Sequence, residues 1–138
     1  TININLLRGV IPDEVMETIH AEYAGTEADR ELYQIQARNL AALNEAGVKI
    51  AFGTDGREMY EVFIEMENMV AAGMTPAEVI VASTRTSAEM LRLDDIGTLE
   101  PGKRADFIVL NANPLDNIIN TRRIESVYLR GQEINREK

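Results

Sequence analysis

The sequence predicts an α/β structure over residues 1–93, followed by short β-strands over residues 94–138. Three observations support this division. Apolar residues repeat with helical spacing in several segments before Leu93, and a short run rich in β-branched residues lies between two of them. After Leu93, similar short runs alternate with polar turns. The change of periodicity places the boundary near Leu93.

The composition excludes several classes of protein. The 138 residues are 45% hydrophobic and 27% charged, which suits one soluble domain or a piece of a larger one. No run approaches the roughly 20 apolar residues of a membrane-spanning helix, so no membrane partner is expected. The net charge of −9 argues against a nucleic-acid partner. The absence of cysteine excludes disulfides and thiolate catalysis and leaves the cellular compartment open.

The first third of the chain contains one expected strand and two expected helices. Residues 1–7 alternate between apolar and polar side chains, which is typical of a strand. A short helix is expected from Pro12 to about Tyr23, because proline and acidic residues occupy its first turn. Apolar residues at helical spacing predict a second helix over residues 27–46, and Gly47 should end it.

The middle of the chain combines a buried strand with two helices. Residues 48–52 are apolar apart from Lys49 and are followed by Gly53-Thr54-Asp55-Gly56, which predicts a buried strand leading into a tight loop. A helix over about residues 58–72 should bury a methionine-rich stripe. Thr75, Pro76 and Glu78 together indicate the start of the next helix, which should run to about Leu91. Its expected core-facing residues are Ala77, Ile80, Val81, Thr84, Ala88 and Leu91.

The last section is expected to form strands joined by turns. Residues 106–110 and 124–129 are the two expected strands. Turns are expected at residues 100–103 and 113–116, and a further tight turn at residues 130–132 should precede Glu133 and Ile134.

Asp55 is the main candidate for catalysis. It stands at the C-terminal end of a predicted buried strand, where catalytic side chains collect in α/β architectures. A carboxylate there can bind a metal or accept a proton from water. A structural interpretation is equally open, because Asp55 and Glu58 have the spacing of a helix capping box.

The other polar candidates are assigned structural or solvent-facing roles. His20 is the single histidine, so one chain cannot build a site that needs several imidazoles, and we interpret it as a solvated helix residue. Arg57 is likewise assigned to the surface. The acidic residues of the 58–72 helix are interpreted as a solvated face; they are Glu58, Glu61, Glu65 and Glu67.

Three blocks of sequence resemble the metal-dependent amidohydrolase superfamily, in its imidazolonepropionase-like and Xaa-Pro-dipeptidase-like branch. They are residues 47–56 (GVKIAFGTDG), 73–78 (GMTPAE) and 97–110 (GTLEPGKRADFIVL). The third block is the most specific. The similarity spans roughly residues 27–135 and is to the C-terminal end of those enzymes.

The resemblance implies a fold, a site and a missing part. Residues 1–93 would be the C-terminal part of a (β/α)₈ TIM-like barrel, and residues 94–138 strands of a small β-sandwich. Asp55 matches the family aspartate that ligates metal and acts as general base. A whole barrel needs about 250 residues, and the family's other metal ligands precede this region. Many relatives carry histidine where Phe63 stands, and asparagine is common at the position of Thr86.

The expected function follows from that resemblance. The chain is expected to be the C-terminal fragment of an amidohydrolase that cleaves an amide or cyclic C–N bond with metal-activated water, inactive alone. A divalent metal, with zinc as the default, would belong to the complete enzyme and not to this chain alone. The substrate would be a small molecule or dipeptide-like, and the barrel segment missing from this chain would act in cis or in trans. A homo-oligomer, a non-catalytic binding or assembly module and one half of a split enzyme remain open.

Overall fold

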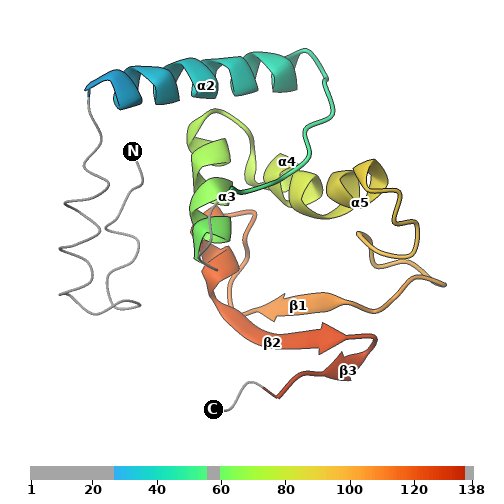
Figure 1. The fold of residues 1–138 in the computed structure, drawn as a ribbon. Helices are drawn as coiled ribbons and strands as arrows, with labels where there is room; N and C mark the ends of the chain where they lie inside the picture. Colours follow the sequence, from blue (N-terminus) through green and yellow to red (C-terminus); the bar gives the residue numbers. More distant parts are fainter. Residues whose placement is uncertain (1–26, 56–59, 136–138) are drawn as a thin grey trace.

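The computed structural model describes residues 27–55 and 60–135 (Figure 1). Four helical segments precede the strands: α2 (Glu27–Glu45), α3 (Glu61–Ala71), α4 (Pro76–Val81) and α5 (Ser87–Met90). A π-helical turn, η2 (Ala82–Thr86), joins α4 to α5. The strands are β1 (Phe107–Leu110), β2 (Ile124–Leu129) and β3 (Gln132–Glu133), with a 3₁₀ turn, η3 (Ile118–Arg122), before β2.

Several sequence-based predictions lie outside the described residues. They are the strand over residues 1–7, the helix from Pro12 to Tyr23, and the placements of His20, Arg57 and Glu58.

Helix α2 begins and ends where the sequence predicts. Glu27 and Asp29 lie in its first turn, where the positive end of the helix dipole favours carboxylates. At the other end, the Gly47 N–H donates to the Asn44 carbonyl and the Val48 N–H donates to the Leu43 carbonyl, each at 3.0 Å. This Schellman arrangement requires the left-handed backbone of Gly47, whose φ is +75°. The predicted role of Gly47 is therefore confirmed.

The expected strand over residues 48–52 is not assigned as a strand. Figure 1 shows residues 48–55 as a stretched connection that leaves α2, and we call it the extended segment. Within the described residues, no second strand runs beside it. Its backbone hydrogen-bonds to helices instead, as in the bond from the Phe52 N–H to the Ala82 carbonyl at 3.2 Å. Because a strand is defined by its ladder to a neighbour, the local pattern alone could not decide this assignment.

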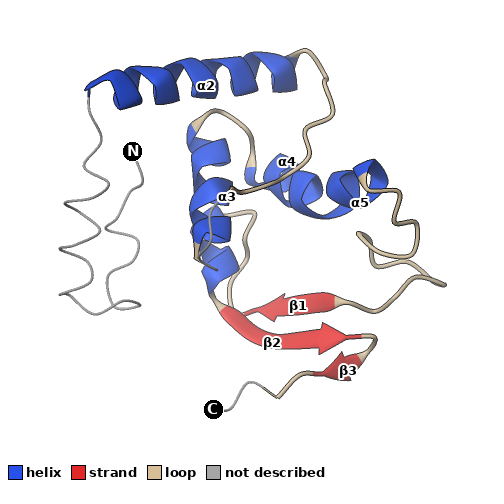
Figure 2. Ribbon diagram, in the orientation of Figure 1, coloured by secondary structure: helices blue, strands red, loops and turns tan. Residues whose placement is uncertain are grey.

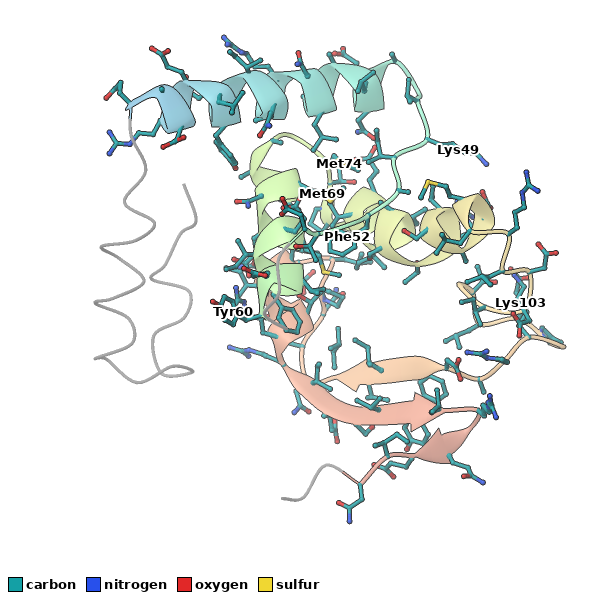
Figure 3. All side chains as sticks on the ribbon, viewed as in Figure 1. Lys49, Phe52, Tyr60, Met69, Met74 and Lys103 are labelled. Atoms are coloured by element: carbon teal, nitrogen blue, oxygen red, sulfur yellow. The ribbon has the colours of Figure 1, made fainter. Side chains whose placement is uncertain are left out.

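Helices α4 and α5 and the π turn between them form one continuous helix, Pro76–Met90, which we call the α4–α5 helix. The hydrophobic core lies where α3, this helix and η3 meet. Its buried residues are Met69, Met74, Val79, Ala82 and Ile118. Met66, Val70 and Phe52 pack against this cluster, so the methionine-rich stripe of α3 is largely core, as predicted. Figure 3 shows the labelled Met69, Met74 and Phe52 gathered between α3 and α4.

Helix α4 starts at the predicted capping box. The Glu78 N–H donates to Thr75 Oγ1 at 3.3 Å, and the Thr75 N–H donates to Glu78 Oε2 at 2.7 Å. The buried face of this helix was predicted wrong in part. Ala77, Thr84 and Leu91 are exposed, whereas Val79 is fully buried. The helix packs against α3 on a face that its own sequence did not reveal.

The strands form one antiparallel sheet in the order β1-β2-β3, set below the helices in Figure 2. Both predicted strands are confirmed, and the Phe107 and Tyr128 rings stack across them with centroids 4.5 Å apart. Arg130 and Gly131, at φ 52° and 76°, form the tight turn into β3. The turn η3, which places Ile118 in the core and whose first turn is capped by the Asn117 side chain, was not predicted.

Gly97, in the loop after α5, packs closely against the π turn, and its replacement should lower the stability of the protein. Its φ is +88°, and a Cβ would lie 2.7 Å from the Ala88 Cβ and 3.1 Å from the Thr84 carbonyl oxygen. We expect Gly97→Ala to lower the free energy of unfolding by about 2–4 kcal/mol, since left-handed strain and overpacking add. Urea unfolding measures this.

Gly102→Ala is the matched control for Gly97→Ala. Gly102 has a similar φ of +92°, but a Cβ added there would meet no heavy atom of the described residues within 4 Å. Only the backbone strain of about 1–2 kcal/mol should remain. Equal losses for the two variants would show that the contact with the π turn contributes nothing.

Candidate functional site

Asp55 lies at the exposed end of the extended segment that leaves α2. Its side chain is exposed, while Ile50 and Phe52 earlier in the segment are half-buried and pack against the core. The segment therefore passes from the packed interior to the surface within a few residues, and the Asp55 carboxylate lies at its exposed end. The sequence predicted Asp55 at the end of a buried strand, whereas the structure places it at the end of a segment without strand pairing, and its role in a site stays a prediction.

Two sets of contacts hold the extended segment against the α4–α5 helix. The Phe52 N–H donates to the Ala82 carbonyl at 3.2 Å and to Ser87 Oγ at 3.1 Å. Nearer α2, Lys49 Nζ donates to Glu89 Oε2 at 2.8 Å. This hydrogen bond and the Lys49 charge lower the pKa of Glu89. These contacts with the α4–α5 helix hold the extended segment that ends at Asp55.

Asp55 does not hold the N-cap position of the next helix. Helix α3 begins at Glu61, with Tyr60 at the N-cap position and no side-chain capping bond there. The structural interpretation of Asp55 as the cap of that helix is therefore not supported by the described helix start. Glu58, its expected partner in a capping box, lies outside the described residues.

Glu65 is a second carboxylate in the neighbourhood of Asp55. Burial raises the pKa of Glu65, the Asp55 charge raises it further, and a hydrogen bond with Asn68 partly opposes them. The Tyr33 hydroxyl donates to Asn68 Oδ1 at 3.3 Å, and burial together with the Glu65 charge raises the pKa of Tyr33. Tyr33, Glu65 and Asn68 line a groove of about 340 Å³ between α2 and α3.

The prediction that the acidic residues of α3 form a solvated face was wrong for Glu67. Its side chain is only 10% exposed, and Arg122 Nε donates to Glu67 Oε1 at 2.7 Å. The Arg122 guanidinium also lies over the Phe63 ring, 5.5 Å from its centroid. This pair was not predicted, because Glu67 and Arg122 are 55 positions apart in the sequence.

The described residues do not form a metal site by themselves. Among residues 27–55 and 60–135, no three His, Cys, Asp or Glu side chains gather as a ligand set. Asp55 can supply one oxygen ligand, whereas a zinc site draws on about three or four protein ligands.

Among the described residues, no helix is both long and apolar enough to cross a membrane.

The chain belongs to the amidohydrolase family, whose sequence pattern matches residues 9–134. It is 41% identical over 83 residues to an imidazolonepropionase of Paracoccus denitrificans, covering 56% of this chain and 21% of the relative. It is 35% identical over 89 residues to a 5-methylthioadenosine/S-adenosylhomocysteine deaminase of Teredinibacter turnerae, covering 55% of this chain and 20% of that enzyme. The predicted kinship is confirmed.

Solved structures agree with this family and with an α/β fold. A Xaa-Pro dipeptidase with bound methionine in its active site aligns with a TM-score of 0.67 and 32% identity. The alignment covers 72% of this chain and 25% of the dipeptidase. This chain thus spans about a fifth of the length of the two curated relatives and a quarter of the solved enzyme.

Proposed function

We propose that the chain is the C-terminal portion of a metal-dependent amidohydrolase that hydrolyses an amide or cyclic C–N bond. The observation that carries the proposal is the position of Asp55, exposed at the end of an extended segment that helices hold in place. In (β/α)₈ enzymes, catalytic residues come from the C-terminal ends of barrel strands. Family membership over residues 9–134 supports the same architecture.

On this proposal, residues 1–93 complete the barrel and residues 94–138 contribute strands to a small β-sandwich. The extended segment 48–52 would be the last barrel strand, paired on each side with strands from a preceding segment, supplied in cis or in trans. Both backbone groups of Phe52 bond to the α4–α5 helix and Lys49 contacts it through its side chain, so the proposed pairing would involve the backbone of residues 49–51. The antiparallel sheet of β1, β2 and β3 suits one layer of a sandwich.

The proposed reaction assigns Asp55 a proton-transfer role. A bound divalent cation, with zinc as the default, would supply acidification of the attacking water. Asp55 would accept the proton from that water and deliver it to the leaving nitrogen, as a general base and then a general acid. Since deaminases and dipeptidases break C–N bonds, the relatives' names support a small-molecule or dipeptide-like substrate.

Metal analysis tests the division of the site between this chain and the rest of the enzyme. We expect the isolated 138-residue chain, dialysed at micromolar concentration, to retain no stoichiometric zinc. The reason is that the described residues provide Asp55 but no ligand cluster. Elemental analysis of the dialysed protein gives the ratio directly.

The complete enzyme in the same buffer is the control and should retain its metal. About one tightly held zinc per isolated chain would contradict the proposal, because a full set of three or four ligands would then lie within this sequence. Absence of metal from both proteins would favour a non-catalytic module.

A further inference from the structure

The Ser87 hydroxyl lies at the junction of the extended segment and the α4–α5 helix. It accepts a hydrogen bond from the Phe52 N–H at 3.1 Å. Its own proton reaches the Ala82 carbonyl at 2.7 Å, and the Phe52 carbonyl lies 3.3 Å away. One hydroxyl thus meets both backbone groups of Phe52, and it does so three residues before Asp55.

The π turn makes this arrangement available. Ser87 directly follows η2 (Ala82–Thr86), and its hydroxyl bonds the carbonyl five residues earlier. A π turn is wider than an α-helical turn, so a carbonyl and a side chain there can serve partners outside the helix. The Ala82 carbonyl does this, because it also accepts the Phe52 N–H at 3.2 Å.

The π turn is braced from its other side. Gly97 lies so close that a Cβ would come 3.1 Å from the Thr84 carbonyl and 3.2 Å from the Arg85 Cα. Ala82, the first residue of the turn, and Ala88, two residues beyond its end, are 2% and 6% exposed. A turn that is packed on both sides gives the Ser87 hydroxyl a fixed place from which to hold Phe52.

A nearby serine shows that this contact is specific to position 87. The Ser83 hydroxyl, also half-buried and within the same turn, donates to the Ile80 carbonyl at 3.1 Å. That bond remains inside the helix and touches no part of the extended segment. The Ser83 hydroxyl therefore bonds only within the helix, whereas the Ser87 hydroxyl joins the helix to the extended segment.

We infer that Ser87 is a positioning residue that clamps Phe52 and thereby sets the place of Asp55 at the end of the segment. This inference rests on the proposed function of Asp55. Without the hydroxyl, Phe52 keeps only the longer bond from its N–H to Ala82, and the segment gains freedom at the point where it turns toward the surface. A displacement of about 1 Å at a catalytic group can lower a rate about a hundredfold.

The test compares Ser87→Ala with Ser83→Ala in the complete enzyme. Amide hydrogen exchange at residues 52–55 should become about two- to tenfold faster in Ser87→Ala, the effect of losing about one hydrogen bond. It should not change in Ser83→Ala. In the same proteins, kcat should fall about ten- to hundredfold for Ser87→Ala, with KM nearly unchanged, because orientation and not substrate binding is lost.

Unchanged exchange at residues 52–55 in Ser87→Ala would overturn the clamp, whatever Asp55 does. Faster exchange with an unchanged kcat would overturn the positioning role, provided that Asp55→Asn lowers kcat in parallel. If Asp55→Asn itself keeps normal turnover, the proposed function fails, and the exchange comparison still decides whether Ser87 holds the segment.

Discussion

Asp55→Asn is expected to lower the kcat of the complete hydrolase by at least about two orders of magnitude. General-base contributions are typically about 10²–10⁴-fold, and loss of the metal ligand that we propose for Asp55 would add to this. The melting temperature should change little, because Asp55 is exposed and Tyr60 holds the N-cap position of α3. Steady-state kinetics and thermal unfolding of the same preparations, with matched metal content, measure both effects.

Glu65→Gln is the matched control for Asp55→Asn. It removes a neighbouring carboxylate whose charge interacts with Asp55, while keeping the size of the side chain. Turnover should stay near normal, since Glu65 lies in the groove between α2 and α3 and has no assigned role in the reaction. Near-normal turnover of Asp55→Asn would remove the one catalytic assignment in this chain.

Arg122→Ala should cause a large loss of stability. The Arg122 and Glu67 side chains are only 16% and 10% exposed, and Glu67 Oε2 accepts no hydrogen bond from the described part of the chain. Removing the arginine leaves a buried carboxylate uncompensated, at a cost of about 3–5 kcal/mol. The contact with the Phe63 ring is lost as well. Chemical denaturation measures the change.

Two controls distinguish the cost of a buried, unpaired charge at Glu67 and Arg122 from the cost of lost packing. Arg30→Ala breaks an ion pair with Glu27 that is 52% and 84% exposed, and should cost less than about 1 kcal/mol. The double variant Glu67→Leu/Arg122→Met replaces the charges with apolar groups and should recover most of the lost stability. A small loss in Arg122→Ala would show that the Glu67 carboxylate is readily solvated.

The sequence predicted those elements whose signals are local. The capping box of Thr75 and Glu78, the stop at Gly47 and the strand over residues 124–129 all depend on neighbours within a few positions. Asp55 was chosen as a candidate from its local setting as well, at the end of an apolar run, and its role stays a prediction. Helix termini and strand periodicity are determined by such short-range interactions, which a single sequence displays directly.

The tertiary structure decided which distant polar groups meet. Glu67 and Arg122 are 55 positions apart, and Ser87 and Phe52 are 35 apart. Neither pairing has a sequence signal, because each depends on a turn of unusual geometry, η3 for Arg122 and the π turn for Ser87. The family blocks were readable from the sequence alone, and the role of Asp55 stays a prediction. The burial of Glu67 and the hold on Phe52 depend on how α3 and the α4–α5 helix pack, since a polar side chain is buried only where a remote partner compensates its lost hydration.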